Sequence, residues 1–538
     1  MICNPILPGF NPDPSIVRVG EEYFIATSTF EWYPGVQIHR STDLVNWRLA
    51  CRPLDRASQL DMRGNPDSGG IWAPCLSYAD GLFWLVYTDV KRLDGNFKDT
   101  HNFVVTAPTI EGPWSDPIFL NSKGFDPSLF HDDDGRKYVI NLQWSHLRGS
   151  HGAKLPHPAF DGIYAQEWSV DRGLFGPVML LSKGSALGLT EGPHLYKRNG
   201  WYYLTMAEGG TGYAHAVTML RSRQIAGPYA FHPDVHLLTT KDHPEAELQR
   251  AGHGQIVETP EGLTYHTHLC SRPLKGLAER RSPLGRETAI QKCVWRDDWL
   301  FLEHGGPVPA VEIPAPVDVQ PEGLRALRRR FDDEVLPEEF QWLRTPFPER
   351  LFTLTGEALR LTGRESIGSW FEQSLVARRQ EHFVYRAETT LTGFAPETYQ
   401  QAAGLTTYYN RYKFHFACVT TLDDGTGDGQ RVLTILSAAN DYPHGDLSFP
   451  CDPVPIPEGE ISLAVEVDNA RQQFFYNLGD GWEKLGPELD ASILSDEGGR
   501  PLVGFFTGAF VGMMAFDTSG MGMTADFTRF DYVPEGAA

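Results

Sequence analysis

Basic residues are scarce relative to acidic ones in this chain of 538 residues. Lysine and arginine together number 47, against 69 aspartate and glutamate residues, which gives a formal net charge of −22 at pH 7. Such a surplus of negative charge repels phosphate backbones and anionic lipid surfaces, and it favours a neutral or cationic partner. We therefore expect a protein that binds neither nucleic acid nor a membrane.

Cysteines are few, and long apolar runs are absent. The cysteines are scattered, at positions 3, 51, 75, 270, 293, 418 and 451. Their odd number and wide spacing favour neither a disulfide framework nor a zinc site and are typical of reduced thiols. No run of about 18 apolar residues occurs, and the first residues, MICNPILPGF, do not resemble a signal peptide. We expect a cytoplasmic protein.

Sustained helical periodicity is also scarce, whereas short aromatic runs bounded by turn-forming residues dominate the first part of the chain. Five times, a glycine in a polar turn pattern precedes an aromatic strand pattern. The glycines are Gly20, Gly81, Gly135, Gly200 and Gly262, at spacings of 61, 54, 65 and 62 residues. Repeats of this length fit four strands with long loops, so they predict a five-bladed β-propeller. Five unrelated hairpins in a sandwich are the alternative.

One position in each repeat carries a chemically active or aromatic side chain. Counting back from the glycines gives Asp13, Trp72, Asp126, Glu191 and His253. The strands that open the blades of a propeller line its central axis, so we expect these side chains to meet at one mouth. Proline follows both aspartates, which predicts an extended aspartate before each strand. Crowded carboxylates are costly to bury unless they have a task, so the pattern favours a site over a set of turns.

Two carboxyl groups in an aromatic pocket are the minimum apparatus for hydrolysing a glycosidic bond. One protonates the leaving oxygen, while the other activates water or attacks. A third carboxylate nearby would raise the pKa of the acid by like-charge repulsion. The distance between the carboxyl groups decides between inversion and retention, and the sequence leaves this distance open.

Six ordered motifs, NPDPSI, WAPCLSY, GFDPSLF, TEGPHLY, AGHGQIV and LGRETAIQ, resemble the family 43 glycoside hydrolases, and in particular their two-domain β-xylosidases. The resemblance covers nearly the whole chain. It implies inversion at the anomeric carbon. It also implies that Asp13 is the general base that activates water, Glu191 the general acid, and Asp126 the residue that tunes and orients the acid.

The same resemblance implies a sugar pocket around these groups. Arg286 matches a sugar-binding arginine, and Phe30, Trp72 and Trp144 match aromatic walls. His253 matches an axial histidine that in several relatives approaches a calcium ion or water. One imidazole is far from the six to eight oxygens that calcium binds, so waters would complete such a site. The chemistry itself requires no cofactor.

Three other acidic features lie outside the repeated position. Glu208 and Glu287 are expected to support the site, for example by orienting Arg286. The run from Asp132 to Gly135 resembles the start of a calcium loop but lacks its downstream glutamate, so we expect a solvated turn.

Five prolines between residues 307 and 321 predict a stiff linker over 307–323, after a catalytic domain over 1–306. Alternating polar and apolar residues over 324–538 predict an antiparallel β-sandwich, jelly-roll-like in type. The resemblance implies that a loop of this domain, FFTGAFVGMM, projects Phe510 toward the pocket and closes it. A closed pocket would admit only chain ends.

These features predict an exo-acting hydrolase that releases xylose from the non-reducing ends of β-1,4-xylo-oligosaccharides. An α-L-arabinofuranosidase, or an enzyme with both activities, is the first alternative, and a non-catalytic carbohydrate-binding protein is the second. A sucrose or fructan hydrolase would carry an Asn-Asp-Pro-Asn motif, whereas this chain has Asn11-Pro12-Asp13-Pro14. The resemblance implies a dimer or tetramer.

Overall fold

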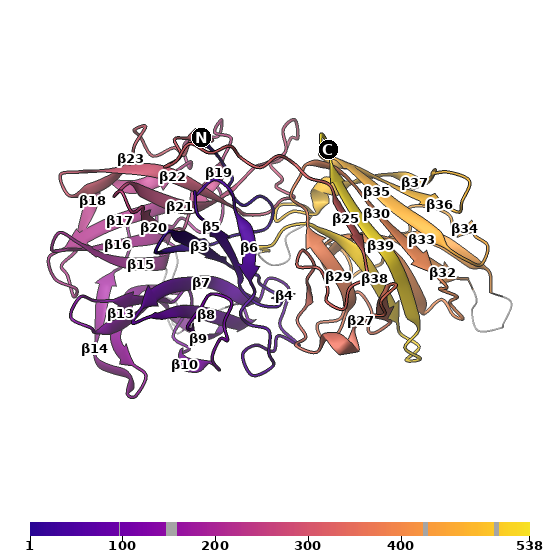
Figure 1. Ribbon diagram of the computed structural model, residues 1–538, viewed down its shortest axis with the longest axis horizontal. Helices are drawn as coiled ribbons and strands as arrows, with labels where there is room; N and C mark the ends of the chain where they lie inside the picture. Colours follow the sequence, from indigo (N-terminus) through magenta and orange to yellow (C-terminus); the bar gives the residue numbers. More distant parts are fainter. Residues whose placement is uncertain (96, 147–158, 423–428, 500–504, 538) are drawn as a thin grey trace. The chain divides into compact units, whose positions relative to one another are not determined.

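The computed structural model describes residues 1–95, 97–146, 159–422, 429–499 and 505–537 (Figure 1). Strands dominate it, and two short 3-10 turns, η1 (Pro348–Arg350) and η2 (Ala491–Ile493), interrupt them. The chain forms two compact units. Unit 1 comprises residues 1–60, 68–272 and 286–321, and unit 2 comprises residues 61–67, 273–285 and 322–538.

Five antiparallel sheets follow one another along unit 1 (Figure 1), each with its strands paired mainly in chain order. The first contains β2 (Ser15–Val19), β3 (Glu22–Thr27), β5 (Gln37–Ser41) and β6 (Arg48–Cys51), with the short β4 (Trp32–Tyr33) in the connection. The second contains β7 (Gly70–Ala79), β8 (Leu82–Arg92), β9 (Asp99–Ala107) and β10 (Ile118–Asn121). The third contains β11 (Ser128–His131), β12 (Lys137–Trp144), β13 (Phe160–Ser169) and β14 (Gly173–Ser182).

The fourth sheet contains β15 (Glu191–Arg198), β16 (Trp201–Glu208), β17 (Ala216–Ser222) and β18 (Ala230–Thr239). The fifth contains β19 (Gln249–Gly252), β20 (Ile256–Glu258), β21 (Thr264–Ser271), β22 (Glu287–Arg296) and β23 (Trp299–Leu302). The opening strands β2, β7, β11 and β15 lie against one another in this order, and β20 of the fifth sheet lies against β2. This order is consistent with the predicted five-bladed propeller.

The five repeated glycines lie in the hairpin turns that join the first strands of each sheet. Gly20, Gly81, Gly135, Gly200 and Gly262 have φ values of 62°, 76°, 85°, 73° and 83°. These values lie in the left-handed region, which glycine adopts without steric cost. The periodicity of the sequence therefore reflects one tight turn per sheet.

The core of unit 1 lies between neighbouring sheets. Trp84 and Val86 of the second sheet pack with Leu129 and Trp168 of the third, and similar buried clusters join the third sheet to the fourth and the fifth to the first. Burying each such side chain contributes about 1.5–3 kcal/mol, so the sheets form a rigid support for the residues at their strand openings.

The proline-rich segment belongs to unit 1 up to residue 321, which differs from the separate linker predicted over 307–323. Its strand β24 (Glu312–Ile313) pairs with β1 (Ile2–Cys3). The Tyr265 hydroxyl donates to the Pro314 carbonyl at 3.0 Å. Proline tolerates the edge of a sheet, where its missing N–H is not needed, so this segment can dock although it is proline-rich.

Two antiparallel sheets make up most of unit 2. One contains β25 (Leu327–Arg330), β27 (Phe352–Leu354), β28 (Leu359–Thr362), β30 (Val384–Thr392), β35 (Ile461–Asp468), β36 (Arg471–Asn477), β37 (Glu483–Asp490) and β39 (Thr524–Pro534). The other contains β29 (Ser374–Arg379), β31 (Gln401–Asn410), β32 (Lys413–Thr421), β33 (Arg431–Ala439), β34 (Val454–Pro455) and β38 (Phe510–Asp517). The short β26 (Trp342–Leu343) lies between β25 and β27 along the chain. Strands of the two sheets contact each other, as the predicted sandwich requires.

Residues 61–67 and 273–285 also belong to unit 2, although 1–306 was predicted as one continuous domain. Asp67 is buried between two guanidinium groups, Arg344 Nη2 at 3.1 Å and Arg411 Nε at 2.6 Å. Arg281 Nη1 lies 3.0 Å from Asp490 Oδ2. Buried charges need partners, so residues 61–67 group with the unit that supplies the partners of Asp67.

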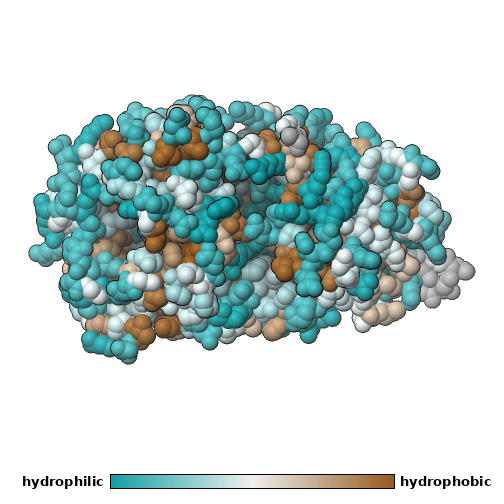
Figure 2. All heavy atoms as spheres, viewed as in Figure 1, coloured by the Kyte–Doolittle hydropathy of each residue, from teal (hydrophilic) through white to brown (hydrophobic). Residues whose placement is uncertain are grey.

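The face of the molecule drawn in Figure 2 is mainly hydrophilic, with scattered apolar patches. Among the described residues, no helix is long and apolar enough to cross a membrane.

Candidate functional site

Asp13 lies two residues before β2 and is almost fully buried. Its Oδ2 accepts a hydrogen bond from Ser28 Oγ at 2.6 Å, and its Oδ1 lies 3.1 Å from Arg286 Nη1 and 3.6 Å from His253 Nδ1. Burial by itself would raise the pKa of Asp13. The nearby Arg286, followed by His253 and the Ser28 hydrogen bond, outweighs burial and lowers this pKa below its usual value of 3.8.

Glu191 opens β15 and is also buried, but its neighbours act in the opposite direction. Burial first, and then the negative charge of Asp13, raise the pKa of Glu191 to about 8. The positive charges of Arg286 and Lys98 oppose this rise without cancelling it. Near neutral pH, Glu191 therefore keeps a proton that it can donate.

Asp126 lies two residues before β11. Burial, followed by the charges of Glu191 and Asp13, raises its pKa well above the usual value, against the hydrogen bond that its Oδ2 accepts from the Gly192 N–H at 3.1 Å. Glu191 and Asp13 both act on Asp126, and Asp13 also acts on Glu191, so the three carboxyl groups influence one another. The contact with Gly192 places Asp126 beside the backbone that carries Glu191.

Four residues at or beside the repeated position have left-handed backbone. The φ values are 57° for Asp13, 54° for Asp126, 35° for His253 and 54° for Gly192. The prediction that proline keeps both aspartates extended is therefore wrong. In residues other than glycine such conformations cost roughly 1–3 kcal/mol each and persist where surrounding contacts fix them, and here both aspartate carboxylates are held by hydrogen bonds.

Aromatic rings line the same region of unit 1. The ring centroids of Phe30 and Trp72 are 6.3 Å apart, those of Trp72 and Phe125 5.0 Å, and those of Phe125 and Trp144 6.0 Å. The Trp72 indole N–H donates to the Ser68 carbonyl at 2.8 Å, which fixes its ring. The predicted wall residues are thus linked into one row, and Phe125 is an additional member of it.

Arg286 joins the aromatic row to the carboxylates. Its guanidinium carbon lies 5.4 Å from the centre of the Phe30 ring, while its Nη1 contacts Asp13. A guanidinium held in this way can both keep Asp13 ionised and donate hydrogen bonds to sugar hydroxyls.

His253 lies beside Asp13, with its ring packed on Gly192. A Cβ added to Gly192 would lie 2.8 Å from His253 Nε2. Across the described ranges, no cluster of three or more His, Cys, Asp or Glu side chains is arranged to hold a metal ion. A calcium ion beside His253 remains a prediction, and in such a site waters would supply most of the oxygen ligands.

The remaining acidic residues take up structural positions. Glu287 accepts hydrogen bonds from Arg272, at 2.7 Å to each carboxylate oxygen, and from Gly9 N at 2.9 Å, so it orients Arg272 rather than Arg286. Asp132 is buried and bonded to Lys197 Nζ at 2.6 Å. The prediction of a solvated turn is therefore wrong for Asp132 and right for Asp133 and Asp134, which are exposed.

Besides Phe125, two further residues of the site were not predicted from the sequence. Ser28 bonds directly to Asp13, and Lys98 lies 4.7 Å from the centre of the Trp144 ring. Neither occupies a repeated position, so periodicity gave no signal for them.

Phe510 is the first residue of β38, where it was predicted to lie in a loop. It is buried in unit 2, in register with Arg379 and Tyr408, and the Arg379 guanidinium lies 5.4 Å from its ring centre. The preceding residues 505–509 have no regular structure. That Phe510 closes the sugar pocket remains a prediction.

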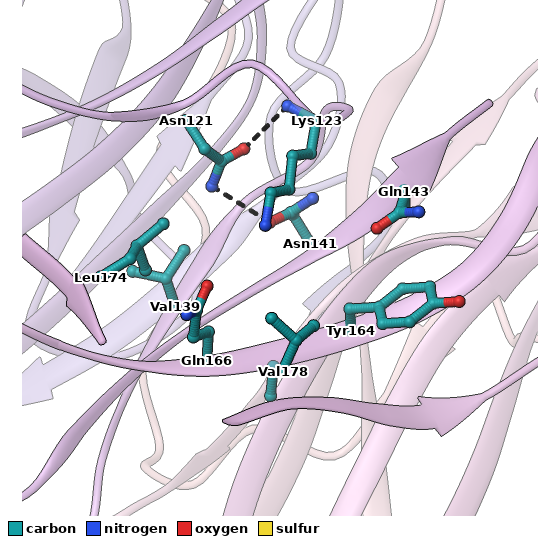
Figure 3. A pocket seen from close by; sticks show the side chains of 10 residues that line it. Asn121, Lys123, Val139, Asn141, Gln143, Tyr164, Gln166, Leu174 and Val178 are labelled. Atoms are coloured by element: carbon teal, nitrogen blue, oxygen red, sulfur yellow. Dashed lines mark hydrogen bonds between the residues drawn. The ribbon is translucent and has the colours of Figure 1, made fainter. Parts of the chain in front are cut away.

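A separate hollow lies on the third sheet and contains none of these carboxylates (Figure 3). Asn121, Asn141, Gln143 and Tyr164 are among the residues that line it. Asn121 accepts from Lys123 N at 3.0 Å and donates to Asn141 at 3.4 Å, as the dashed lines in Figure 3 show. The side-chain amides that line the hollow are thus largely hydrogen-bonded to one another.

Residues 2–300 match the family model of glycosyl hydrolases family 43, and residues 328–533 match a β-xylosidase C-terminal concanavalin A-like domain. The chain is 56% identical to xylosidase/arabinosidase 43B of Humicola insolens, over 99% of this chain and 98% of that protein. It is 43% identical to a xylan 1,3-β-xylosidase of a Vibrio species, over 99% of each.

A crystal structure of xylan β-1,4-xylosidase from Bacillus halodurans C-125 superposes on this structure with a TM-score of 0.92. The two are 47% identical, and the match covers 99% of this chain and 100% of the other. A pair of buried carboxyl groups with opposite pKa shifts, an arginine and a row of aromatic rings accompany these similarities. The chain is therefore a glycoside hydrolase and belongs to family 43.

Proposed function

We propose that this protein is an exo-acting, inverting β-xylosidase that releases xylose from the non-reducing ends of β-1,4-xylo-oligosaccharides. The observation that carries the proposal is the opposite shift of two neighbouring carboxyl groups. The pKa of Asp13 is lowered, whereas that of Glu191 is raised to about 8. One ionised and one protonated carboxyl group at neutral pH are what the hydrolysis of a glycosidic bond requires, and the family resemblance adds the single displacement by water.

In the proposed reaction, Asp13 takes a proton from water, whose oxygen attacks the anomeric carbon of the terminal xylose. The bond from this carbon to the glycosidic oxygen breaks as Glu191 gives its proton to that oxygen. The products are α-xylose and a chain one sugar shorter, with Asp13 protonated and Glu191 ionised. Asp126, beside the Gly192 N–H, would keep Glu191 oriented.

The proposed pocket binds sugar through Arg286 and the rings of Phe30, Trp72 and Trp144. Apolar rings suit the C–H faces of a pyranose, and a guanidinium can donate to two adjacent hydroxyls. We extend the proposal to closure of the pocket by Phe510, which would explain exo action. Assembly into a dimer or tetramer and a part in xylan degradation belong to the same proposal and rest on the family resemblance. A cytoplasmic location also belongs to it and rests on the scattered cysteines, which are typical of reduced thiols.

A proton NMR time course with xylobiose tests the substrate and the mechanism together. Each cleavage releases one xylose from the non-reducing end, whereas the former reducing-end xylose is already a mixture of anomers. We expect α-xylose to exceed its equilibrium share at first and β-xylose to rise later by mutarotation. An early excess of β-xylose would contradict the single displacement, and an absence of cleavage would contradict the substrate.

An α-L-arabinofuranosidase activity is the second candidate, favoured by the name of the Humicola insolens relative, xylosidase/arabinosidase 43B. Both sugars present similar hydroxyls to one pocket. Comparing kcat/KM for 4-nitrophenyl β-D-xyloside and 4-nitrophenyl α-L-arabinofuranoside ranks the two activities. The name of the Vibrio relative adds a β-1,3 linkage to the disaccharides worth comparing.

A further inference from the structure

The carboxyl group of Glu191 receives no hydrogen bond from the part of the chain that the structure describes, and only burial and nearby charges act on it. Such a carboxyl is available to a glycosidic oxygen, but its own bonds do not fix its direction. Its position depends on the backbone of β15 and on the loop of residues 183–190 that leads into this strand.

Glu208 is fully buried at the end of β16, and its side chain holds this loop. Its Oε1 accepts from Ser185 N at 2.7 Å and from Thr190 Oγ1 at 2.8 Å. Its Oε2 accepts from Thr218 Oγ1 of β17. One side chain thus ties both the start and the end of the loop to the fourth sheet, and Thr190 is the residue that precedes Glu191.

The loop packs closely around this carboxyl group. A Cβ added to Gly184 would lie 1.8 Å from Thr190 Oγ1 and 2.5 Å from Glu208 Oε1. The Gly209 N–H also donates to the Gly188 carbonyl at 2.8 Å, and the Glu208 carbonyl lies 3.1 Å from His215 Nδ1. The peptide group that follows Glu208 is therefore fixed as well.

We propose that Glu208 is a positioning residue for the general acid. By bonding Ser185 and Thr190 it fixes the loop that ends at Glu191, and it keeps the Glu191 carboxyl directed at the leaving oxygen. This inference rests on the proposed role of Glu191. Misplacing a catalytic group by about 1 Å can cost roughly a hundredfold in rate.

The test uses the dependence of the rate on the leaving group, because only poor leaving groups need a proton from the acid. Thr190→Val keeps the shape of the side chain and removes its bond to Glu208. We expect kcat for xylobiose to fall about 10-fold, whereas kcat for 2,4-dinitrophenyl β-D-xyloside falls less than about 2-fold. Glu208→Gln, which removes one acceptor oxygen, is expected to show the same selectivity.

Thr259→Val is the matched control. Thr259 is a buried threonine of the fifth sheet whose Oγ1 accepts from Leu263 N at 3.2 Å in the β20–β21 turn. The Thr259→Val variant is expected to leave the ratio of kcat for xylobiose to kcat for 2,4-dinitrophenyl β-D-xyloside unchanged. Thermal unfolding of each variant checks folding, and Thr190→Val keeps the test available if Glu208→Gln does not fold.

Glu191→Gln separates the two hypotheses. If this variant is selective for good leaving groups and Thr190→Val loses both substrates equally, the positioning role of Glu208 is overturned and the acid remains. If Glu191→Gln loses both substrates equally, the acid assignment fails, and this inference fails with it.

Discussion

Asp13 and Glu191 are both carboxyl groups buried at strand openings, so burial does not distinguish them. The two groups differ in the charge of their nearest ionised neighbour. Arg286 lies 3.1 Å from Asp13, whereas the negative charge of Asp13 acts on Glu191. The proposed base thus also helps to keep the proposed acid protonated, so the two roles depend on each other.

The pH dependence of kcat/KM for xylobiose follows from these shifts. Activity needs Glu191 protonated, so it is present below pH 8 and is lost as the pH rises through about 8. It also needs Asp13 ionised, and since the pKa of Asp13 is lowered, the acid limb is expected below pH 3.8. Steady-state rates across the acid and alkaline ranges measure both limbs.

Lys98 offers a variant that moves only one of these limbs. Its positive charge lowers the pKa of Glu191. Lys98→Met removes this charge and keeps an apolar contact with Trp144, so the alkaline limb is expected to move to higher pH while the acid limb stays in place. An alkaline limb that does not move, or moves down, would contradict the assignment of this limb to Glu191.

The individual residues at the repeated position could be predicted from the sequence, because this position recurs once in each sheet of unit 1. Asp13, Asp126, Glu191 and His253 were found in this way, and they lie close enough to shift one another's pKa. Ser28 was not predictable, since its contact with Asp13 depends on how two strands pair. The backbone of both aspartates was predicted wrongly, because contacts with distant residues override the preference imposed by the following proline.

At the scale of elements, the first residues of β15 connect Glu191, the proposed acid, to the residues around Asp13, the proposed base. Glu191 begins the strand, Gly192 donates to Asp126, and the ring of His253 lies on Gly192. His253 in turn lies 3.6 Å from Asp13. A single glycine therefore sets how closely the fourth and fifth sheets approach at the site.

Gly192→Ala tests this arrangement. The new methyl group would lie within 2.9 Å of the His253 ring, at a φ of 54°, so the ring or the strand must move. We expect kcat/KM to fall about 10–100-fold.

Gly200→Ala is the control, because it has a φ of 73° in the same hairpin and meets only the Arg223 side chain at 3.4 Å. It shares the backbone strain without the clash, so it should lower the thermal midpoint and leave kcat/KM nearly unchanged. Equal kinetic losses in both variants would show that strain, and not the contact with His253, matters.

At the scale of the whole molecule, the composition of the two units was only partly predictable. Alternating residues indicated the strands of both units, and the proline-rich segment marked the boundary near residue 321. Residues 61–67 and 273–285 carry no pattern that assigns them to unit 2. Their assignment depends on partners far along the chain, such as Arg411 for Asp67.

Asp67→Ala is expected to be strongly destabilising. It would leave the guanidinium groups of Arg344 and Arg411 buried without their shared carboxylate, and breaking a buried ion pair costs about 3–5 kcal/mol. Denaturant unfolding followed by fluorescence measures the loss.

Asp526→Ala is the control for this variant. It removes a partly buried carboxylate that bonds Nε and Nη2 of the exposed Arg360, each at 2.7 Å, and a pair at the surface contributes about 0–1 kcal/mol. If the two variants lose equal stability, the burial of Asp67 is not what makes its contacts important.

The assignment of residues 61–67 to unit 2 has a consequence for synthesis on the ribosome. These residues leave the ribosome long before Arg344 and Arg411, which hold Asp67 in the finished protein. Domains generally fold in the order in which they are made, but here an early segment must wait until much of unit 2 has been translated. A nascent chain halted before Arg411 should therefore expose residues 61–67 to protease, and its release at full length should protect them.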